Sequence, residues 1–350
     1  MTIKHPYEGI PPYSRWKQGV NDGVDSRELV AGLRFRGLRE GDRVFSAGSC
    51  FASNMVPYLE KAAIAYVRTE KRPRVFSGLK DGLGYENFSA RFGNIYTSRQ
   101  FLQLLLRCTG QWAPAEDRWR TPAGLIDPFR PGLTFLAASD SEFEAVTRSH
   151  LLATRAAIEA ATVIVFTLGL TEAWQAADGA VFPVCPGTVA GVFDPGKHRF
   201  MNLSTSQVTA DLLECHSQIS KLNPNARFVL TVSPVPLTAT ATGKHVVVAS
   251  LESKATLRAA VAGAQAAQDE IEYFPAYELL MGWQTPPGSW DTDMRTVTKA
   301  GLDYVMSVLL PGSKVASNTQ PDNAAAAVER LSELISEAEC DEGAYAKFGS

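Results

Sequence analysis

Two apolar runs in the chain, residues 162–168 and 226–233, lack the alternation that marks a strand with one face in water. Such continuous runs are typical of strands covered on both faces. Shorter apolar strands are expected at 43–47, 65–67 and 271–274. Amphipathic helical patterns separate these strands, so the sequence predicts an α/β fold with three α/β/α layers and a mainly parallel central sheet.

The helical patterns have apolar residues at spacings of three and four positions. They cover residues 97–108, 140–161, 204–221 and 245–268. A further helix is expected to begin near Ser53, after the first strand, and Thr97 or Ser98 is expected to cap the helix that follows it. In parallel sheets ligands bind beyond the carboxyl ends of the strands, so the turns after residues 47, 168, 232 and 274 are expected to share one edge.

Proline, glycine and polar residues divide the chain into regions. Residues 1–40 are polar and broken by prolines, which predicts an irregular N-terminal arm on a domain that spans 41–320. Residues 175–199 are too long and too rich in Gly and Pro for a bare connection, and we expect a lid or insertion there. A C-terminal helix and a polar tail are expected in 321–350.

Composition narrows the classes of function. The 350 residues are 45% hydrophobic and 20% charged, with a net charge of −3, so neither a nucleic acid nor an anionic membrane is an expected partner. No apolar run approaches the roughly 20 residues that span a bilayer. The N-terminus lacks the apolar stretch of a secretory signal, which makes a cytoplasmic location the expectation. The oligomeric state is not predicted.

No metal or cofactor is expected from the sequence. There is no phosphate-binding loop and no dinucleotide fingerprint, and Asp291 and Asp293 are interpreted as solvated carboxylates rather than cation ligands. The cysteines are five in number, far apart, and without a Cys-x-x-Cys pair, which argues against a zinc site or a disulfide framework. They are Cys50, Cys108, Cys185, Cys215 and Cys340.

The small residues around Cys50 offer the best place for a nucleophile. They stand between a strand and a helix, where a sharp turn lets the backbone approach a ligand and where the first N–H groups of the helix favour an anion. A thiol is also the nucleophile that depends least on a partner base. The alternative is that Cys50 is a small buried residue in a tight turn.

Two other turns carry polar residues near strand or helix ends. The Gly93 N–H or the Asn94 amide can donate to an oxyanion, and so can the Thr171 hydroxyl or the Gly169 backbone. Glu172 can orient a base. The alternatives are that Asn94 is an ordinary turn residue and that Thr171 and Glu172 begin the next helix.

Five ordered motifs between about residue 40 and residue 310 resemble those of the GSCFA family. They are Gly48-Ser49-Cys50-Phe51-Ala52, Gly93-Asn94-Ile95-Tyr96-Thr97, Thr167-Leu168-Gly169-Leu170-Thr171-Glu172-Ala173-Trp174, Ser233-Pro234-Val235-Pro236 and Phe274-Pro275-Ala276-Tyr277-Glu278. GSCFA proteins are distantly similar to the SGNH, or GDSL-type, esterases and acyltransferases. The resemblance implies an SGNH-like α/β/α fold.

The resemblance also implies roles for individual residues. When the Gly48-Ser49-Cys50 turn is aligned with the Gly-Asp-Ser turn of SGNH enzymes, Cys50 corresponds to the nucleophilic serine and Ser49 to the aspartate. Gly93 matches the oxyanion glycine, and Thr171 matches the asparagine of the Gly-x-Asn-Asp block. The expected site consists of these positions together with the expected substrate-binding residues, which are Ser49, Asn94, Glu172 and Trp174.

The last SGNH landmark departs from the pattern. SGNH enzymes carry Asp-x-x-His, whereas the matching segment here is Asp293-Met294-Arg295-Thr296, so the base is missing. A cysteine nucleophile without a histidine is consistent with attack by a thiolate and also with lost catalysis. His245 is the best-placed substitute, ahead of the other histidines, which are His5, His150, His198 and His216.

Two functions follow from this interpretation. The first is an ester hydrolase or acyltransferase with Cys50 as nucleophile, acting on a small-molecule or glycan ester and assisted by Asp293 or His245; the glycan is suggested by the SGNH resemblance. The second is an inactive SGNH-like module that binds a glycan or acyl ligand. In that case aromatic side chains are expected to stack on sugar faces, namely Tyr96, Trp174, Trp283 and Trp290.

Overall fold

The computed structural model describes residues 5–48, 50–72, 85, 87–133 and 136–310, with Cys50 and Phe51 described by their backbone alone. Ser49 and the helix expected in 321–350 lie outside the described residues. The central sheet has five strands in the order β2-β1-β5-β9-β10, and every neighbouring pair is parallel. The strands are β1 (Arg43–Ala47), β2 (Ala65–Tyr66), β5 (Val163–Leu168), β9 (Arg227–Val232) and β10 (Ile271–Phe274). The predicted parallel α/β fold is confirmed.

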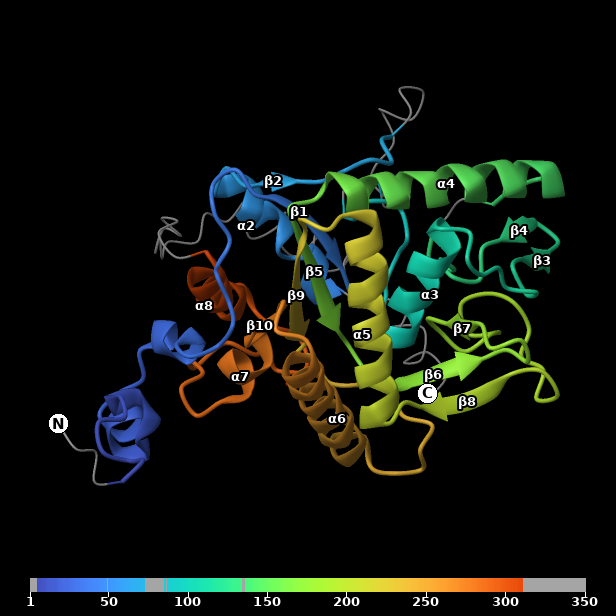
Figure 1. The fold of residues 1–350 in the computed structure, drawn as a ribbon. Coiled ribbons are helices and arrows are strands. Elements are labelled where there is room, and N and C mark those ends of the chain that lie inside the picture. The colour runs from blue at the N-terminus through green and yellow to red at the C-terminus, as the bar shows by residue number, and fades with distance from the viewer. Residues whose placement is uncertain (1–4, 49, 73–84, 86, 134–135, 311–350) are drawn as a thin grey trace, which may run out of the picture.

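Helices cover both faces of the sheet and make the three layers (Figure 1). One face packs against α3 (Ser98–Cys108), α4 (Asp140–Ala160), α5 (Thr205–Leu222) and α6 (Val246–Ala267). The other face packs against α2 (Val56–Lys61), α7 (Ala276–Met281) and α8 (Lys299–Leu309). Neighbouring residues of β5 alternate between these two cores, which explains why the whole strand is apolar.

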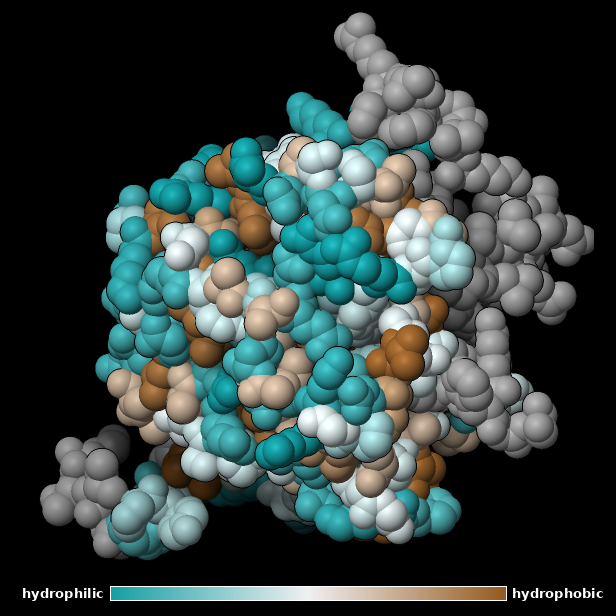
Figure 2. All heavy atoms as spheres, turned by 90° about the vertical axis from the view of Figure 1, so that its right-hand side faces the viewer, coloured by the Kyte–Doolittle hydropathy of each residue, from teal (hydrophilic) through white to brown (hydrophobic). Residues whose placement is uncertain are grey.

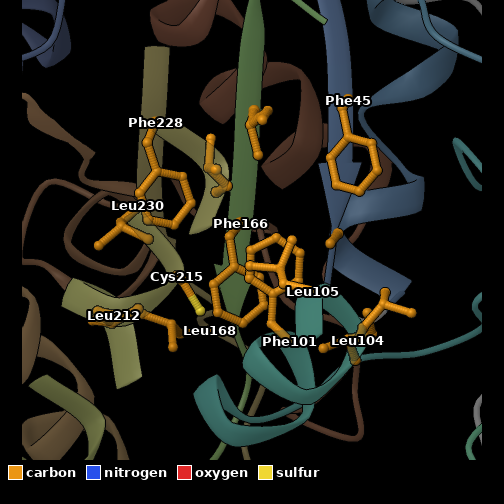
Figure 3. Close-up of a cluster of buried hydrophobic side chains, with 14 of the residues drawn as sticks. Phe45, Phe101, Leu104, Leu105, Phe166, Leu168, Leu212, Cys215, Phe228 and Leu230 are labelled. Atoms are coloured by element: carbon orange, nitrogen blue, oxygen red, sulfur yellow. The ribbon is translucent and has the colours of Figure 1, made fainter. Parts of the chain in front are cut away.

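The larger core is built around aromatic side chains that point from the strands toward α3 and α5 (Figure 3). The rings of Phe101 and Phe166 stack with centroids 4.4 Å apart, and Phe228 lies 6.4 Å from Phe101. Cys215 of α5 is buried in the same cluster. This core fixes α3, and therefore the loop that leads into it, against the middle of the sheet.

The stretch expected to be a lid is part of a small antiparallel sheet. Its strands, in the order β7-β6-β8, are β6 (Glu172–Gln175), β7 (Val181–Phe182) and β8 (Arg199–Asn202). The alternative that Thr171 and Glu172 begin a helix is therefore wrong: the chain continues from Glu172 as β6, the middle strand of this sheet. A separate hairpin joins β3 (Trp119–Thr121) and β4 (Gly124–Ile126).

The helix expected from Ser53 is interrupted. The structure has a single turn, α1 (Cys50–Ser53), and then α2 from Val56. Pro57 lies at the start of α2, where it lacks the N–H that would continue the α1 ladder. The first helix is thus too short for the strong dipole that the sequence pattern suggested.

The N-terminal arm lies on the domain and contains three short helices. They are η1 (Pro12–Ser14), η2 (Lys17–Asn21) and η3 (Ser26–Val30). Farther along, the Phe35 ring lies 5.2 Å from that of Phe274 in β10. The backbone N–H of Arg36 donates to Oε2 of Glu272 at 2.8 Å, and Arg227 forms an ion pair with the same carboxylate. The arm is thereby tied to the edge strand β10.

The surface mixes polar and apolar residues. On the face that lies to the right in Figure 1, apolar residues stand singly or in small groups between polar ones (Figure 2). Among the helices of the described ranges, none combines the length and the apolar composition that a membrane crossing requires.

Candidate functional site

The carboxyl ends of the parallel strands meet at one edge of the sheet. The register pairs Ala47 with Phe166 and Leu168 with Val232, so the turns after β1, β5 and β9 lie beside one another, as predicted. Gly48 is the first residue beyond β1, and Cys50 begins α1 two positions later. The backbone therefore places residue 50 at the edge where ligands bind in such sheets.

Gly48 is held where no side chain fits. Its φ is +153°, and a Cβ atom there would lie 2.8 Å from Cβ of Thr167 and 2.9 Å from Cβ of Ala52. Real Cβ contacts are longer, so a side chain at residue 48 would push the turn away from β5. The glycine is required because the β1 turn packs directly on the neighbouring strand.

The loop of residues 93–97 ties the β1 and β5 turns together. The N–H of Ile95 donates to the carbonyl oxygen of Gly48 at 2.8 Å. The carbonyl oxygen of Tyr96 accepts from the N–H groups of Gly169 and Leu170 at 2.9 and 3.1 Å. We call residues 48 and 50, 93–97 and 169–171 together the strand-end site, because these backbone hydrogen bonds join three segments that are far apart in the chain.

Gly93 and Asn94 lie at the start of that loop. Gly93 has a φ of +70°, a conformation that favours glycine, and a Cβ atom there would find no neighbour closer than 3.9 Å. Asn94 is buried and lines a small cavity on the side of the loop that carries Arg130 and His150. The expected oxyanion roles of Gly93 and Asn94 stay predictions.

Thr171 is fully buried and bonded on both sides. Its N–H donates to Oγ of Ser253 at 3.0 Å, and its hydroxyl donates to Oδ1 of Asn202 at 2.6 Å. The hydroxyl proton is thus engaged with β8 in this structure. Thr171 holds the turn after β5 against α6 and β8.

Glu172 and Trp174 line a pocket of about 280 Å³ beside the turn after β5. The pocket lies between β6, β8 and residues 237–241, and most of its wall is apolar, with Phe200 and Leu237 among the lining residues. Trp174 packs edge-on against Phe200 with ring centroids 5.7 Å apart. The Glu172 carboxylate accepts hydrogen bonds from the Thr240 hydroxyl and the Ala241 N–H at 2.6 and 3.1 Å, so it anchors the 237–241 loop.

Lys254 of α6 reaches the strand-end site and was missed by the sequence reasoning. It is 3% exposed, and its ammonium group donates to the carbonyl oxygen of Gly169. The hydroxyl oxygen of the neighbouring Ser253 accepts the N–H of Thr171, so two consecutive residues of α6 form hydrogen bonds with the turn after β5. The sequence does contain one indication of this burial, because Lys254 stands three and seven positions before Leu257 and Val261 and so lies on the same, buried face of the helix.

His245 lies at the N-terminus of α6 and is exposed. Its Nδ1 accepts the N–H of Val247 at 3.3 Å, so the ring caps the helix. The structure therefore gives His245 a structural contact, and a role as acid or base stays a prediction.

Asp293 lies in an exposed loop and bonds within it. Oδ1 accepts the N–H groups of Arg295 and Thr296, both at 2.8 Å, and Oδ2 accepts the Thr296 hydroxyl at 2.6 Å. Although partial burial opposes it, these hydrogen bonds hold the pKa of Asp293 below its usual value. The residue at the expected histidine position, Thr296, is thus a partner of Asp293 rather than a replacement base.

Three of the other cysteines have environments that disfavour a thiolate. Burial raises the pKa of Cys108 to about 12 and that of Cys185 to about 11, and it raises the pKa of Cys215 well above its usual value. Within the ranges that the structure describes, no group of three or more His, Cys, Asp or Glu side chains is placed to hold a metal ion.

Comparison with known proteins gives one family, and the solved structures that it finds include two distant ones. A family model described as the GSCFA family matches residues 43–308, while no curated protein matches the chain. The solved carbohydrate esterase family 2 enzyme with a carbohydrate binding domain from Corynascus thermopiles (Myceliophthora fergusii) is 13% identical, with a TM-score of 0.30 over 80% of this chain and 68% of its own. An acetyl xylan esterase from the rumen bacterium Butyrivibrio proteoclasticus is 10% identical, with a TM-score of 0.26 over 68% of this chain and 56% of its own. This chain therefore spans little more than half of the second enzyme, and the activities in both descriptions belong to those proteins.

Proposed function

The chain belongs to the GSCFA family, and from this premise and the geometry of the strand-end site we propose that it hydrolyses or transfers the acyl group of an ester through a thiolate at Cys50. The observation that carries the proposal is the set of backbone hydrogen bonds that joins Gly48, the 93–97 loop and the turn after β5. They join Gly48, two positions before Cys50, to the two segments that we propose for the oxyanion.

In the proposed reaction, the Cys50 thiolate attacks the ester carbonyl carbon and forms a tetrahedral oxyanion. Backbone N–H groups at residues 50 and 93, or the Asn94 amide, donate to that oxyanion. The C–O bond then breaks, the alcohol leaves and takes up a proton, and an acyl-cysteine remains. Water or a second alcohol attacks the acyl-cysteine and releases the thiolate.

Lys254 supplies the positive charge that the missing histidine would otherwise provide. A buried ammonium group at the Gly169 carbonyl stands at the same strand ends as the turn that carries Cys50. A nearby cation stabilises a thiolate and lowers the pKa of its thiol. Because α1 is a single turn, its dipole is weak, and in this proposal the charge of Lys254 contributes to the stabilisation of the thiolate.

The 280 Å³ pocket supports an ester with one apolar or ring-shaped part, such as an acyl chain or an acylated sugar. Trp174 offers a flat apolar wall, and the threonines at 188, 238 and 240 add hydroxyl groups that suit a partly polar ligand. A binding module without catalysis would use the same pocket, so the test must report on the covalent step.

Intact-protein mass spectrometry after exposure to p-nitrophenyl butyrate tests that step. We expect one butyryl adduct on the wild-type chain, mapped to Cys50 by peptide analysis and absent from Cys50→Ala. Cys185→Ala is the matched control, because Cys185 lines the pocket but its pKa is raised to about 11. An adduct spread over several cysteines, or none at all, would overturn the acyl-enzyme proposal and favour the binding module.

A further inference from the structure

A buried cluster of charged side chains lies next to the Gly93–Asn94 loop. Two of its arginines have carboxylate partners. Nε of Arg130 lies 2.8 Å from Oδ2 of Asp127. Nη1 of Arg91 lies 3.8 Å from Oε1 of Glu70, whose Oε2 also accepts the Arg91 N–H at 2.8 Å.

The third arginine of the cluster, Arg107, has no such partner. It is 8% exposed, and within the described residues its guanidinium group makes neither a hydrogen bond nor an ion pair. It lies over the Phe129 ring, 4.1 Å from the centroid. The nearby Asp117 is taken by Arg118, which donates to both of its carboxylate oxygens at 2.8 Å. In the part of the chain that the structure describes, the cluster therefore carries one buried arginine more than it has carboxylates, which is costly without a counterion.

Gln100 brings a second unused donor to the same place. Its Oε1 accepts the backbone N–H groups of Tyr96 and Thr97, both at 2.9 Å, which fixes the orientation of the amide. The Nε2 group then points elsewhere, and it has no acceptor among the described residues. Gln100 and Arg107 both line the cavity beneath Asn94.

The cavity is small, and His150, which lines it, is uncharged. Its volume of about 20 Å³ holds one particle of the size of a water molecule. His150 contributes to the wall, with Nδ1 2.8 Å from Oε2 of Glu70. Burial lowers the pKa of His150 to about 4, so the ring is neutral at physiological pH.

We propose that this cavity binds a single chloride-sized anion between the Arg107 guanidinium and the Gln100 amide. A monatomic anion fits the volume, whereas phosphate, sulfate and carboxylate groups are larger. A neutral water would accept from both donors but would leave the Arg107 charge uncompensated. Because Gln100 also holds residues 96 and 97, the anion would brace the loop that ties the strand-end site together.

Thermal unfolding of the full chain tests the proposal with sodium chloride against sodium gluconate at equal ionic strength. We expect chloride to raise the Tm of the wild-type protein by about 2 to 4 °C. Arg107→Met keeps apolar contact with Phe129 and is expected to lose the chloride effect. Arg155→Met is the matched control, because Arg155 is exposed and paired with Glu159, and it should keep the effect.

Anomalous diffraction from crystals grown in bromide gives an independent result on the wild-type chain, and it decides the matter if Arg107→Met does not fold. We expect one bromide peak in the cavity, within hydrogen-bond distance of Arg107 and Gln100. The absence of that peak, or a chloride effect that persists in Arg107→Met, would overturn the proposal. Neither result depends on ester turnover, so the anion site and the proposed chemistry can fail separately.

Discussion

The strand-end site and the charged cluster behind it both bury polar groups, and both are built on residues 91–97. At the strand-end site the backbone of Ile95 and Tyr96 bonds to the turns after β1 and β5. In the cluster, the N–H and carbonyl of Arg91 bond to Glu70 and Arg130 instead. One segment thus holds the turns after β1 and β5 on one side and is anchored by charged side chains on the other.

The two regions differ in which polar groups they leave without a partner inside the protein. At the strand-end site the backbone of Gly48 bonds to that of Ile95 and the backbone of Tyr96 to that of Gly169, and Cys50, the nucleophile that we propose, follows two positions after Gly48. The cluster pairs Arg91 and Arg130 with carboxylates and, within the described ranges, leaves Arg107 without one. We therefore expect changes in the first region to alter chemistry and changes in the second to alter stability and its dependence on pH and anions.

We expect the largest effect from Gly48→Ala, a change in the strand-end site that should lower the stability of the fold. The added Cβ would meet Thr167 and Ala52 at less than 3 Å, in a backbone conformation that alanine adopts with strain. We expect a loss of about 2–4 kcal/mol in the free energy of unfolding, measured by urea denaturation. Gly243→Ala, at a position with positive φ but no neighbour within 4 Å, is the control. An equal loss in both variants would show that packing at the β1 turn is unimportant.

The next effect concerns Lys254, whose charge we place beside the Cys50 turn. Lys254→Gln should raise the pKa for alkylation of Cys50 by iodoacetamide and lower acyl transfer about 10- to 100-fold. Ser253→Ala removes the neighbouring contact with Thr171 without a change of charge, so it should leave the pH profile in place. An unshifted profile in Lys254→Gln would remove the lysine from the mechanism.

Gly48 and Lys254 differ in how easily their structural roles can be predicted from the sequence. Gly48 stands in an ordered motif between a strand and a helix, so its role is visible locally. Lys254 lies on an amphipathic helix, where a lysine is ordinarily assigned to solvent, and its burial depends on a contact with Gly169, 85 residues away. The turns that follow β1 and β5 lie at one edge of the sheet, as the strand pattern predicts. In contrast, Asp293 bonds within its own loop and His245 bonds within the N-terminus of its own helix, so their positions could not be predicted from the sequence.

The same reasoning explains which parts of the fold were predicted. β5 and β9 have six residues each and are buried on both faces, which gives an apolar run that is easy to recognise. β6 and β7 have four and two residues, too few for a periodic pattern, and they pair within a region that is rich in Gly and Pro. The break between α1 and α2 was missed because the apolar pattern continues through Pro57.

A third effect should appear in the charged cluster as the pH falls. The pKa of His150 is about 4 when folded because of burial, against an ordinary value of 6.5, so the unfolded chain takes up the proton first. Stability is therefore full above pH 6.5 and should fall by up to about 1.4 kcal/mol per pH unit toward pH 4. We expect His150→Gln to flatten this slope in urea titrations, while His245→Gln, at an exposed helix cap, should follow the wild type. A wild-type slope in His150→Gln would assign the acid sensitivity to other groups.

The smallest effect is expected for Asp293→Ala. Asp293 bonds to Arg295 and Thr296 of its own loop and is exposed, so we expect a stability change below about 1 kcal/mol and acyl transfer within about threefold of the wild type. Asp291→Ala in the same loop is the control. A loss of more than tenfold in acyl transfer for Asp293→Ala alone would place this carboxylate at the strand-end site.

The tie between the N-terminal arm and β10 has a practical consequence. β10 has β9 on one side and ends the described sheet on the other, and the arm contacts this outer strand through Phe35 on the Phe274 ring and Arg36 on the Glu272 carboxylate. An uncovered outer strand offers its backbone to other chains. A recombinant chain shortened by its first 40 residues should therefore self-associate and become insoluble, so the arm belongs in any preparation intended for crystallisation or kinetics.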